Sequence, residues 1–76
     1  MPLHKHTEHG ASEAGWSEAA NEASKSLHAR LTKDHGGSGE VKFLAIRVVE
    51  FWAEPEPNPG SIQVFRTTIE VTADHP

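Results

Sequence analysis

The sequence predicts a small α+β domain of the order β-α-β-β, in which a three-stranded antiparallel sheet partly wraps one helix. Helix-forming residues, alanine above all, recur from residue 12 to residue 34. β-forming side chains dominate residues 41–54, and apolar and polar side chains alternate over residues 61–72. At 76 residues the chain has room for one domain, which we assign to residues 1–76.

The segment before the helix, residues 3–9, consists mainly of polar side chains. Taken alone, this composition predicts either a disordered segment or a weak edge strand. Residues 10–12 (GAS) then break the pattern. The first strand of the predicted fold is therefore the element with the weakest sequence pattern.

The helix is predicted over residues 12–34 by its apolar stripe and by its charges. Acidic side chains lie toward its start and basic side chains toward its end, which suits the helix dipole. Either Ser12 or Gly15 can supply the N-cap, and the Gly-rich residues 36–39 are expected to end the helix in a flexible loop. The side chains of the apolar stripe are Trp16, Ala20, Ala23, Leu27 and Leu31.

The two segments after the helix are predicted to form a long hairpin. Residues 55–60 contain three prolines and a glycine, which cannot continue a strand ladder and so form the turn. Residues 61–72 are the return strand, and residues 73–76 are expected to fray.

The strand over residues 41–54 has apolar side chains on both faces. Strand alternation places Leu44, Ile46 and Val48 on one face, which is the better candidate to meet the helix. It leaves Val49 and Phe51 on the other face, with Trp52 as a further candidate for that face. One helix covers one face of a sheet, so this second apolar face predicts a subunit interface.

Size and composition favour self-association and exclude other classes of partner. A domain this small buries only about 60–65 % of the surface of its unfolded chain, and the chain has no cysteine to form a disulfide. The net charge of −4, without a basic cluster, argues against binding to nucleic acid. No apolar run approaches the roughly 20 residues that span a bilayer. We therefore expect a soluble, cytoplasmic protein.

Four segments carry a resemblance to a known family, in the order in which that family has them. They are residues 10–16 (GASEAGW), 23–27 (ASKSL), 48–50 (VVE) and 65–71 (FRTTIEV). The first looks like a Gly-x-Ser turn before a bulky residue at a helix start, the second like an Ala-Ser-Lys-Thr-Leu helix segment, and the others like the cores of the second and third strands. Together they resemble the dodecins.

The resemblance implies a hollow homododecamer that stores or scavenges a flavin, such as FMN or riboflavin, and is not an enzyme. In dodecins a tryptophan on the second strand stacks on the flavin ring and a glutamine on the third strand binds its edge. Those two positions fall on Ala45 and Arg66 in this sequence. The alternative is a dodecin-like shell that binds no flavin and acts as a structural, metal-binding or anion-binding assembly.

Several residues outside these motifs have two interpretations. His4 and His6 lie on the same strand face and are candidate ligands for zinc, nickel or copper. The alternative is that they belong to a solvated segment. Arg47 and Arg66 could bind an anion, or pair with Glu70 and Glu50 across the strands.

The two tryptophans and the question of catalysis complete the predictions. Trp16 is expected in the core or at an interface, and Trp52 either packs or replaces the missing stacking ring. No nucleophile elbow, phosphate loop or His-Glu-x-x-His motif occurs. We therefore expect a protein without catalytic activity.

Overall fold

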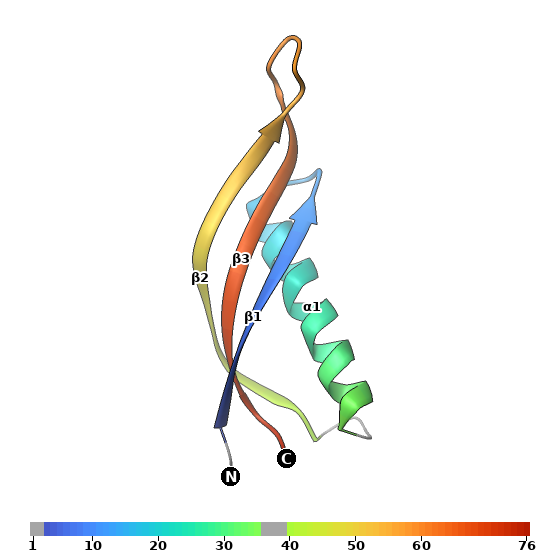
Figure 1. The fold of residues 1–76 in the computed structure, drawn as a ribbon, viewed down its shortest axis with the longest axis vertical. Helices are drawn as coiled ribbons and strands as arrows, with labels where there is room; N and C mark the ends of the chain where they lie inside the picture. Colours follow the sequence, from blue (N-terminus) through green and yellow to red (C-terminus); the bar gives the residue numbers. More distant parts are fainter. Residues whose placement is uncertain (1–2, 36–39) are drawn as a thin grey trace.

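The computed structural model describes residues 3–35 and 40–76 of the chain. The predicted order is confirmed: strand β1 (Leu3–Ser12), helix α1 (Trp16–Asp34), strand β2 (Lys42–Pro55) and strand β3 (Ile62–Asp74). The three strands form one antiparallel sheet of order β1-β3-β2, with β3 in the centre (Figure 1). The Gly-rich loop predicted over residues 36–39 lies outside the described residues.

Strand β1 is a complete ten-residue edge strand although its sequence pattern is weak. It pairs with β3 without interruption, from Leu3 opposite Asp74 to Ser12 opposite Phe65. Because the even-numbered residues face α1 and the odd-numbered residues face away, the polar side chains alternate between two different environments. Pairing with a strongly alternating neighbour therefore supplies the strand character that β1 itself lacks.

Helix α1 begins four residues later than the predicted start at Ser12. Gly15 is its N-cap, and the first intrahelical bond runs from the Ala19 amide to the Gly15 carbonyl at 3.0 Å. Ser12 still belongs to β1, where its hydroxyl accepts a hydrogen bond from the Ala14 amide at 3.0 Å. Of the two predicted caps, Gly15 is therefore correct and Ser12 shapes the turn before it.

The hydrophobic core lies between α1 and the helix-facing side of the sheet. Leu27 of the helix is fully buried against Ile69 and Val71 of the central strand. The predicted apolar stripe supplies most of the helix side of this core. The buried residues that pack together are Ala23, Leu27, Leu31, Val41, Ile69, Val71 and Ala73.

A β-bulge in β2 corrects the predicted placement of Phe51. Val48 lies opposite Ile69, but the next paired residue is Glu50, opposite Thr68, so the register shifts around Val49. The extra residue reverses the alternation that follows it. Phe51 was expected on the face of the sheet away from the helix, which we call the open face. It instead shares the helix-facing side with Val48, while Trp52 points to the open face.

The end of the chain is ordered, which corrects the prediction that residues 73–76 fray. Ala73 is paired in β3 and fully buried, and the His75 side chain is buried as well. Phe43 lies opposite Ala73 in the sheet and packs at the edge of the core. The β3 alternation thus extends farther than its predicted end at residue 72.

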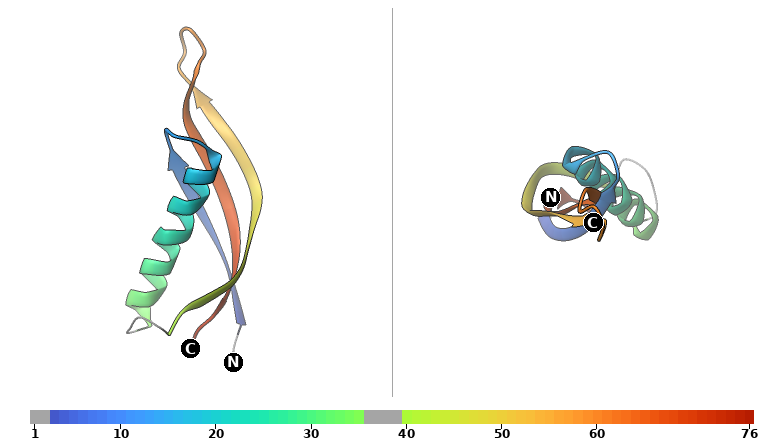
Figure 2. Two further views of the ribbon diagram at one scale, coloured as in Figure 1. Left: turned by 180° about the vertical axis from the view of Figure 1, so that it is seen from behind. Right: turned by 90° about the horizontal axis from the view of Figure 1, so that it is seen from above.

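The helix covers only part of the sheet. Figure 2 shows α1 against β1 and β3, while β2 bows away on the far side of the sheet and the β2–β3 hairpin extends beyond the helix. The molecule is accordingly elongated, with principal dimensions of 50 × 20 × 14 Å. Within the described residues, no helix is long and apolar enough to cross a membrane.

Candidate functional site

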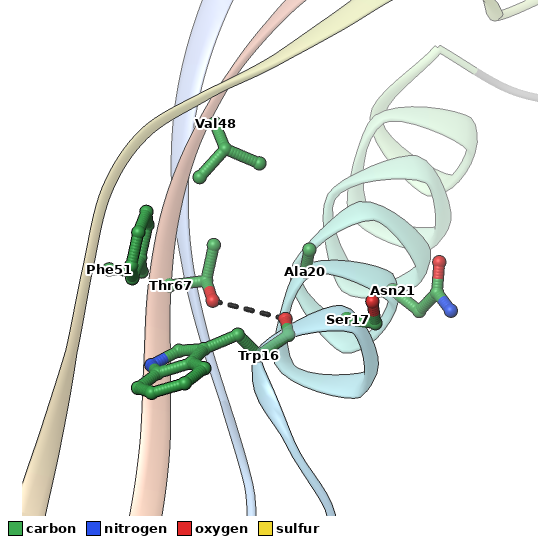
Figure 3. Close-up of a pocket in the computed structure, with 7 residues that line it drawn as sticks. All are labelled: Trp16, Ser17, Ala20, Asn21, Val48, Phe51 and Thr67. Atoms are coloured by element: carbon green, nitrogen blue, oxygen red, sulfur yellow. Dashed lines mark hydrogen bonds between the residues drawn. The ribbon is translucent and has the colours of Figure 1, made fainter.

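A groove opens where α1 diverges from β2. It has a volume of about 480 Å³ and is lined by the first two turns of the helix on one side and by the helix-facing side of β2 and β3 on the other (Figure 3). The groove exists because the helix covers β1 and β3 but not the edge strand β2. Its lining residues are Trp16, Ser17, Ala20, Asn21, Val48, Phe51 and Thr67.

Aromatic side chains form the end wall of this groove. The ring of Trp16 meets that of Phe51 edge to face, with centroids 5.5 Å apart, and meets that of Phe65 in the same way at 4.8 Å. The indole Nε1 of Trp16 donates a hydrogen bond to the backbone oxygen of Trp52 at 3.0 Å. Trp16 is thus held by two rings and one hydrogen bond, so its position is fixed before any ligand enters.

Three polar side chains stand around this apolar wall. The Thr67 hydroxyl donates to the backbone oxygen of Trp16 at 3.2 Å, which ties the start of α1 to the central strand. Ser17 and Asn21 of α1 are the other polar residues of the lining. An apolar wall with a few neutral donors and acceptors is typical of a site that binds a small molecule.

The groove lacks the groups that acid–base or nucleophilic catalysis requires. None of its seven lining residues is ionisable, and Ser17 has no histidine beside it within that lining. General acid–base chemistry needs a titratable side chain within hydrogen-bonding reach of the reacting atom. The lining therefore offers apolar contacts and neutral hydrogen-bonding groups.

Ala45 and Arg66, the positions predicted from the resemblance as flavin contacts, lie elsewhere, on the open face of the sheet. Ala45 is opposite Thr72 and Arg66 is opposite Trp52. Thr72 and Arg66 are six residues apart on β3, which is about 20 Å. Within one chain, Ala45 and Arg66 are therefore too far apart to contact the same planar ring.

The arginines of the open face are paired with carboxylates. Arg47 lies directly opposite Glu70 with 3.8 Å between their charged atoms, and Lys5 approaches the same carboxylate at 3.9 Å. Arg66 is bonded to Glu54 rather than to Glu50, the partner predicted from the sequence, and Glu54 lies on the same open face of the sheet as Arg66. These cross-strand pairs favour the structural interpretation of both arginines over an anion site.

His4 and His6 belong to a larger group of rings at the far end of the molecule from the groove. The His75 ring stacks on His4 with centroids 4.1 Å apart, stacks on His6 at 5.2 Å, and lies 4.3 Å from His35, which is the C-cap of α1. We call these four residues the histidine cluster. His9, by contrast, faces the other side of the sheet, where its Nδ1 bonds the Thr68 hydroxyl at 2.8 Å.

Stacking, rather than convergence on one point, characterises the histidine cluster. Within residues 3–35 and 40–76, no three histidine or carboxylate side chains are arranged to hold a metal ion. Metal binding by His4 and His6 alone stays a prediction. His35 and His75 were not predicted from the sequence, because each follows the predicted end of its element. His35 nevertheless lies where the α1 pattern continues, and His75 lies where the β3 pattern continues.

The electrostatic consequence of the cluster is seen at His6. Burial lowers the pKa of His6, and the neighbouring imidazoles of His75 and His4, the Arg30 guanidinium and His35 lower it further. The surroundings of His6 therefore favour its neutral form.

Comparisons of the chain with protein-family models, curated proteins and solved structures find no match. The site is accordingly interpreted from its own residues and geometry.

Proposed function

We propose that this protein is a dodecin-like, non-enzymatic binding protein that self-associates into a homo-oligomer and holds a small, largely apolar ligand. The observation that carries the proposal is the uncovered apolar surface of β2. Six large apolar side chains of this one strand are between 38 % and 63 % exposed, a density that marks an interaction surface on a small domain. They are Leu44, Ile46, Val48, Val49, Phe51 and Trp52.

The two edges of the sheet differ in the way expected if only one of them is an interface. Edge strand β1 presents Lys5, Thr7 and His9 outward, and a lysine on an edge strand discourages pairing with other chains. Edge strand β2 is longer, at 14 residues, and mainly apolar. A second copy of the chain is the occupant we propose for β2, because burial there supplies the apolar contact that α1 does not.

The small core supports the same conclusion. Among the described residues, the largest fully buried side chains are those of Leu27, Ile69, Val71 and Thr67. A 76-residue domain without disulfides has a thin stability margin, which association with further copies increases. The resemblance to dodecins gives twelve copies in a hollow shell, and we propose that number.

The groove is the proposed ligand site. Its volume of about 480 Å³ lies within the range of pockets for small organic molecules. Because Val48 and Phe51 belong both to the groove and to the exposed surface of β2, a second copy seated on β2 would close the open side of the groove. Assembly and ligand binding are thus coupled through the same two side chains.

A shell that binds no flavin is the second candidate, and one observation favours it. Ala45 offers no ring for stacking, and the Arg66 guanidinium is already bonded to Glu54. The flavin contacts of the dodecins are therefore not reproduced by these two residues. This candidate keeps the assembly but assigns it a structural, metal-binding or anion-binding role.

Two measurements test the proposal. Thermal unfolding should shift to higher temperature as protein concentration rises, because association stabilises only the folded chain. Titration with riboflavin should quench flavin fluorescence if the flavin function holds. A concentration-dependent transition without quenching supports the flavin-free shell, and a transition that is independent of concentration contradicts self-association.

A further inference from the structure

The charges of β2 are divided between the two halves of the strand. Lys42 and Arg47 lie in the first half, and Glu50 and Glu54 lie in the second. All four face the open side of the sheet, because each is opposite an even-numbered residue of β3. In an antiparallel pair of β2 strands, the basic half of each strand runs along the acidic half of the other.

The pairing with β3 measures positions along β2 even where the bulges interrupt the count. Val48 is opposite residue 69 of β3. Arg47 and Glu50 lie one position to either side of it, opposite residues 70 and 68. Lys42 and Glu54 lie equally far out, opposite residues 74 and 64. A two-fold axis through Val48 therefore sets Arg47 against the partner's Glu50 and Lys42 against the partner's Glu54.

The sizes of the uncharged side chains fit the same axis. On the open face, Ala45 comes opposite the partner's Trp52, because these residues are opposite residues 72 and 66 of β3. On the helix-facing side, Phe43 comes opposite the partner's Ala53, from positions 73 and 65. A small side chain thus faces a large one in both pairs, which lets the two strands approach without overlap.

Other positions of the axis lack this complementarity. Moving the axis by one position centres it on Arg47 or on Glu50, and that charged side chain then faces its own copy. Like charges directly opposite each other destabilise a pair of strands. Moving the axis by two positions, to Ile46 or Phe51, keeps only one of the two kinds of charge pair. The charges of β2 therefore select the register centred on Val48.

The ion pairs within the chain leave these charges accessible to a partner. Arg47 has one nitrogen 3.8 Å from Glu70, yet its side chain is 74 % exposed and a guanidinium has several further N–H groups. Glu54, which Arg66 binds, is 47 % exposed. Glu50 is exposed as well. Among the described residues, β2 also has no strand on its outer side, so its backbone groups there are open to pairing.

We propose that two copies of the chain pair antiparallel through β2 about a two-fold axis at Val48, and so join their two sheets into one. The pairing rests on the proposed function, in which a second copy occupies β2, and it names the contacts of that copy. The partner's Val48 and the partner's Ile46 then lie beside Val48 and Phe51 of the groove, so each copy extends the sheet wall of the other's groove.

A single cysteine tests the position of the axis, because the natural chain has none. Directly opposite residues of an antiparallel pair have Cα atoms about 4.5–5.5 Å apart, within the reach of a disulfide. Val48→Cys should therefore form a covalent dimer when oxidised with diamide. Ile46→Cys is the matched control, because its two copies lie about 13 Å apart along the strands. It should form no dimer alone, but should link to Phe51→Cys when the two variants are mixed.

Exchange of charges tests the register independently. Glu50→Lys and Arg47→Glu each place like charges opposite each other in a self-pair, and each should weaken association about tenfold or more. An equimolar mixture of the two variants restores opposite charges at both contacts and should restore association, measured by sedimentation. Glu13→Lys makes the same charge change at an exposed residue of the turn before α1 and should have no effect.

The outcomes separate the pairing from the proposed function. A natural chain that sediments as a monomer at every concentration overturns both. A chain that assembles, but in which Val48→Cys is linked no faster than Ile46→Cys, overturns the pairing and leaves self-association standing. A mixture of Glu50→Lys and Arg47→Glu that associates no better than either variant alone also overturns the register.

Discussion

Gly10 of β1 lies so close beneath Ala23 of α1 that a Cβ on Gly10 would stand 2.8 Å from the Ala23 Cβ and would overlap the carbonyl oxygen of Ala19. This contact sets the separation of the helix from the sheet. The GAS sequence that interrupts the first strand pattern is thus a packing requirement.

Substitution of Gly10 should therefore destabilise the fold. Gly10→Ala forces backbone and side chains apart, and overpacking of this kind costs about 1–3 kcal/mol of unfolding free energy. Gly15→Ala is the matched control, because its Cβ would meet only the flexible end of the Glu18 side chain. Urea denaturation followed by circular dichroism measures both, and equal effects of the two substitutions would refute the close-packing account.

The indole hydrogen bond of Trp16 should contribute measurably to stability. Trp16→Phe keeps an aromatic ring at the groove but removes the donor to the Trp52 backbone oxygen, which we expect to cost about 1 kcal/mol. Trp52→Phe leaves that oxygen in place and serves as the control. Denaturant unfolding of the two variants in parallel should show the larger loss for Trp16→Phe, and the reverse order would contradict the assigned bond.

Removal of the Arg30 charge should raise the pKa of His6. Arg30 is one of the groups that lower this pKa, so Arg30→Met should let His6 protonate at higher pH. NMR titration of the ring signals measures the change directly, and Lys33→Met provides a control that removes the same charge from the same helix. The Arg30 ion pair with Glu8 is half exposed, so its loss should cost less than about 1 kcal/mol.

Filling the groove should abolish ligand binding without unfolding the protein. Ser17 lines the groove and is exposed, so Ser17→Phe places a ring in the space proposed for the ligand. Ser26→Phe makes the same change on an exposed position of α1 outside the groove. A ligand found by screening should bind the Ser26 variant as it binds the natural chain. Undiminished binding by the Ser17 variant would show that the ligand site is elsewhere.

The elements of the fold could be predicted from sequence because each has a local pattern. The stripe from Trp16 to Leu31 has helical spacing, and the alternation around Ile69 and Val71 has the period of a strand. The aromatic wall of the groove could not be predicted, because it depends on the bulge at Val49. That bulge reverses the face of Phe51, and nothing in the local alternation marks it.

The histidine cluster was beyond local patterns for a different reason. His6 and His75 are separated by almost the whole chain, and they meet only because β1 and β3 pair in a register that places His4 opposite Ala73. The polar composition of β1 indicates exposure when it is considered alone. Its even-numbered histidines are instead half-buried against the end of α1, which only the pairing determines.

The central claim is that the apolar strand β2 assembles copies of the chain. Sedimentation velocity over a range of micromolar concentrations tests it most directly, on the natural chain and on a variant with Leu44→Glu and Val49→Glu. The register with β3 passes over both of these β2 residues. A control with Ser26→Glu and Ala29→Glu adds the same charge to the exposed side of α1. We predict a species of twelve times the 8.3 kDa chain mass for the natural chain and the control, and a smaller species for the β2 variant. A folded 8.3 kDa monomer of the natural chain at every concentration would contradict the claim.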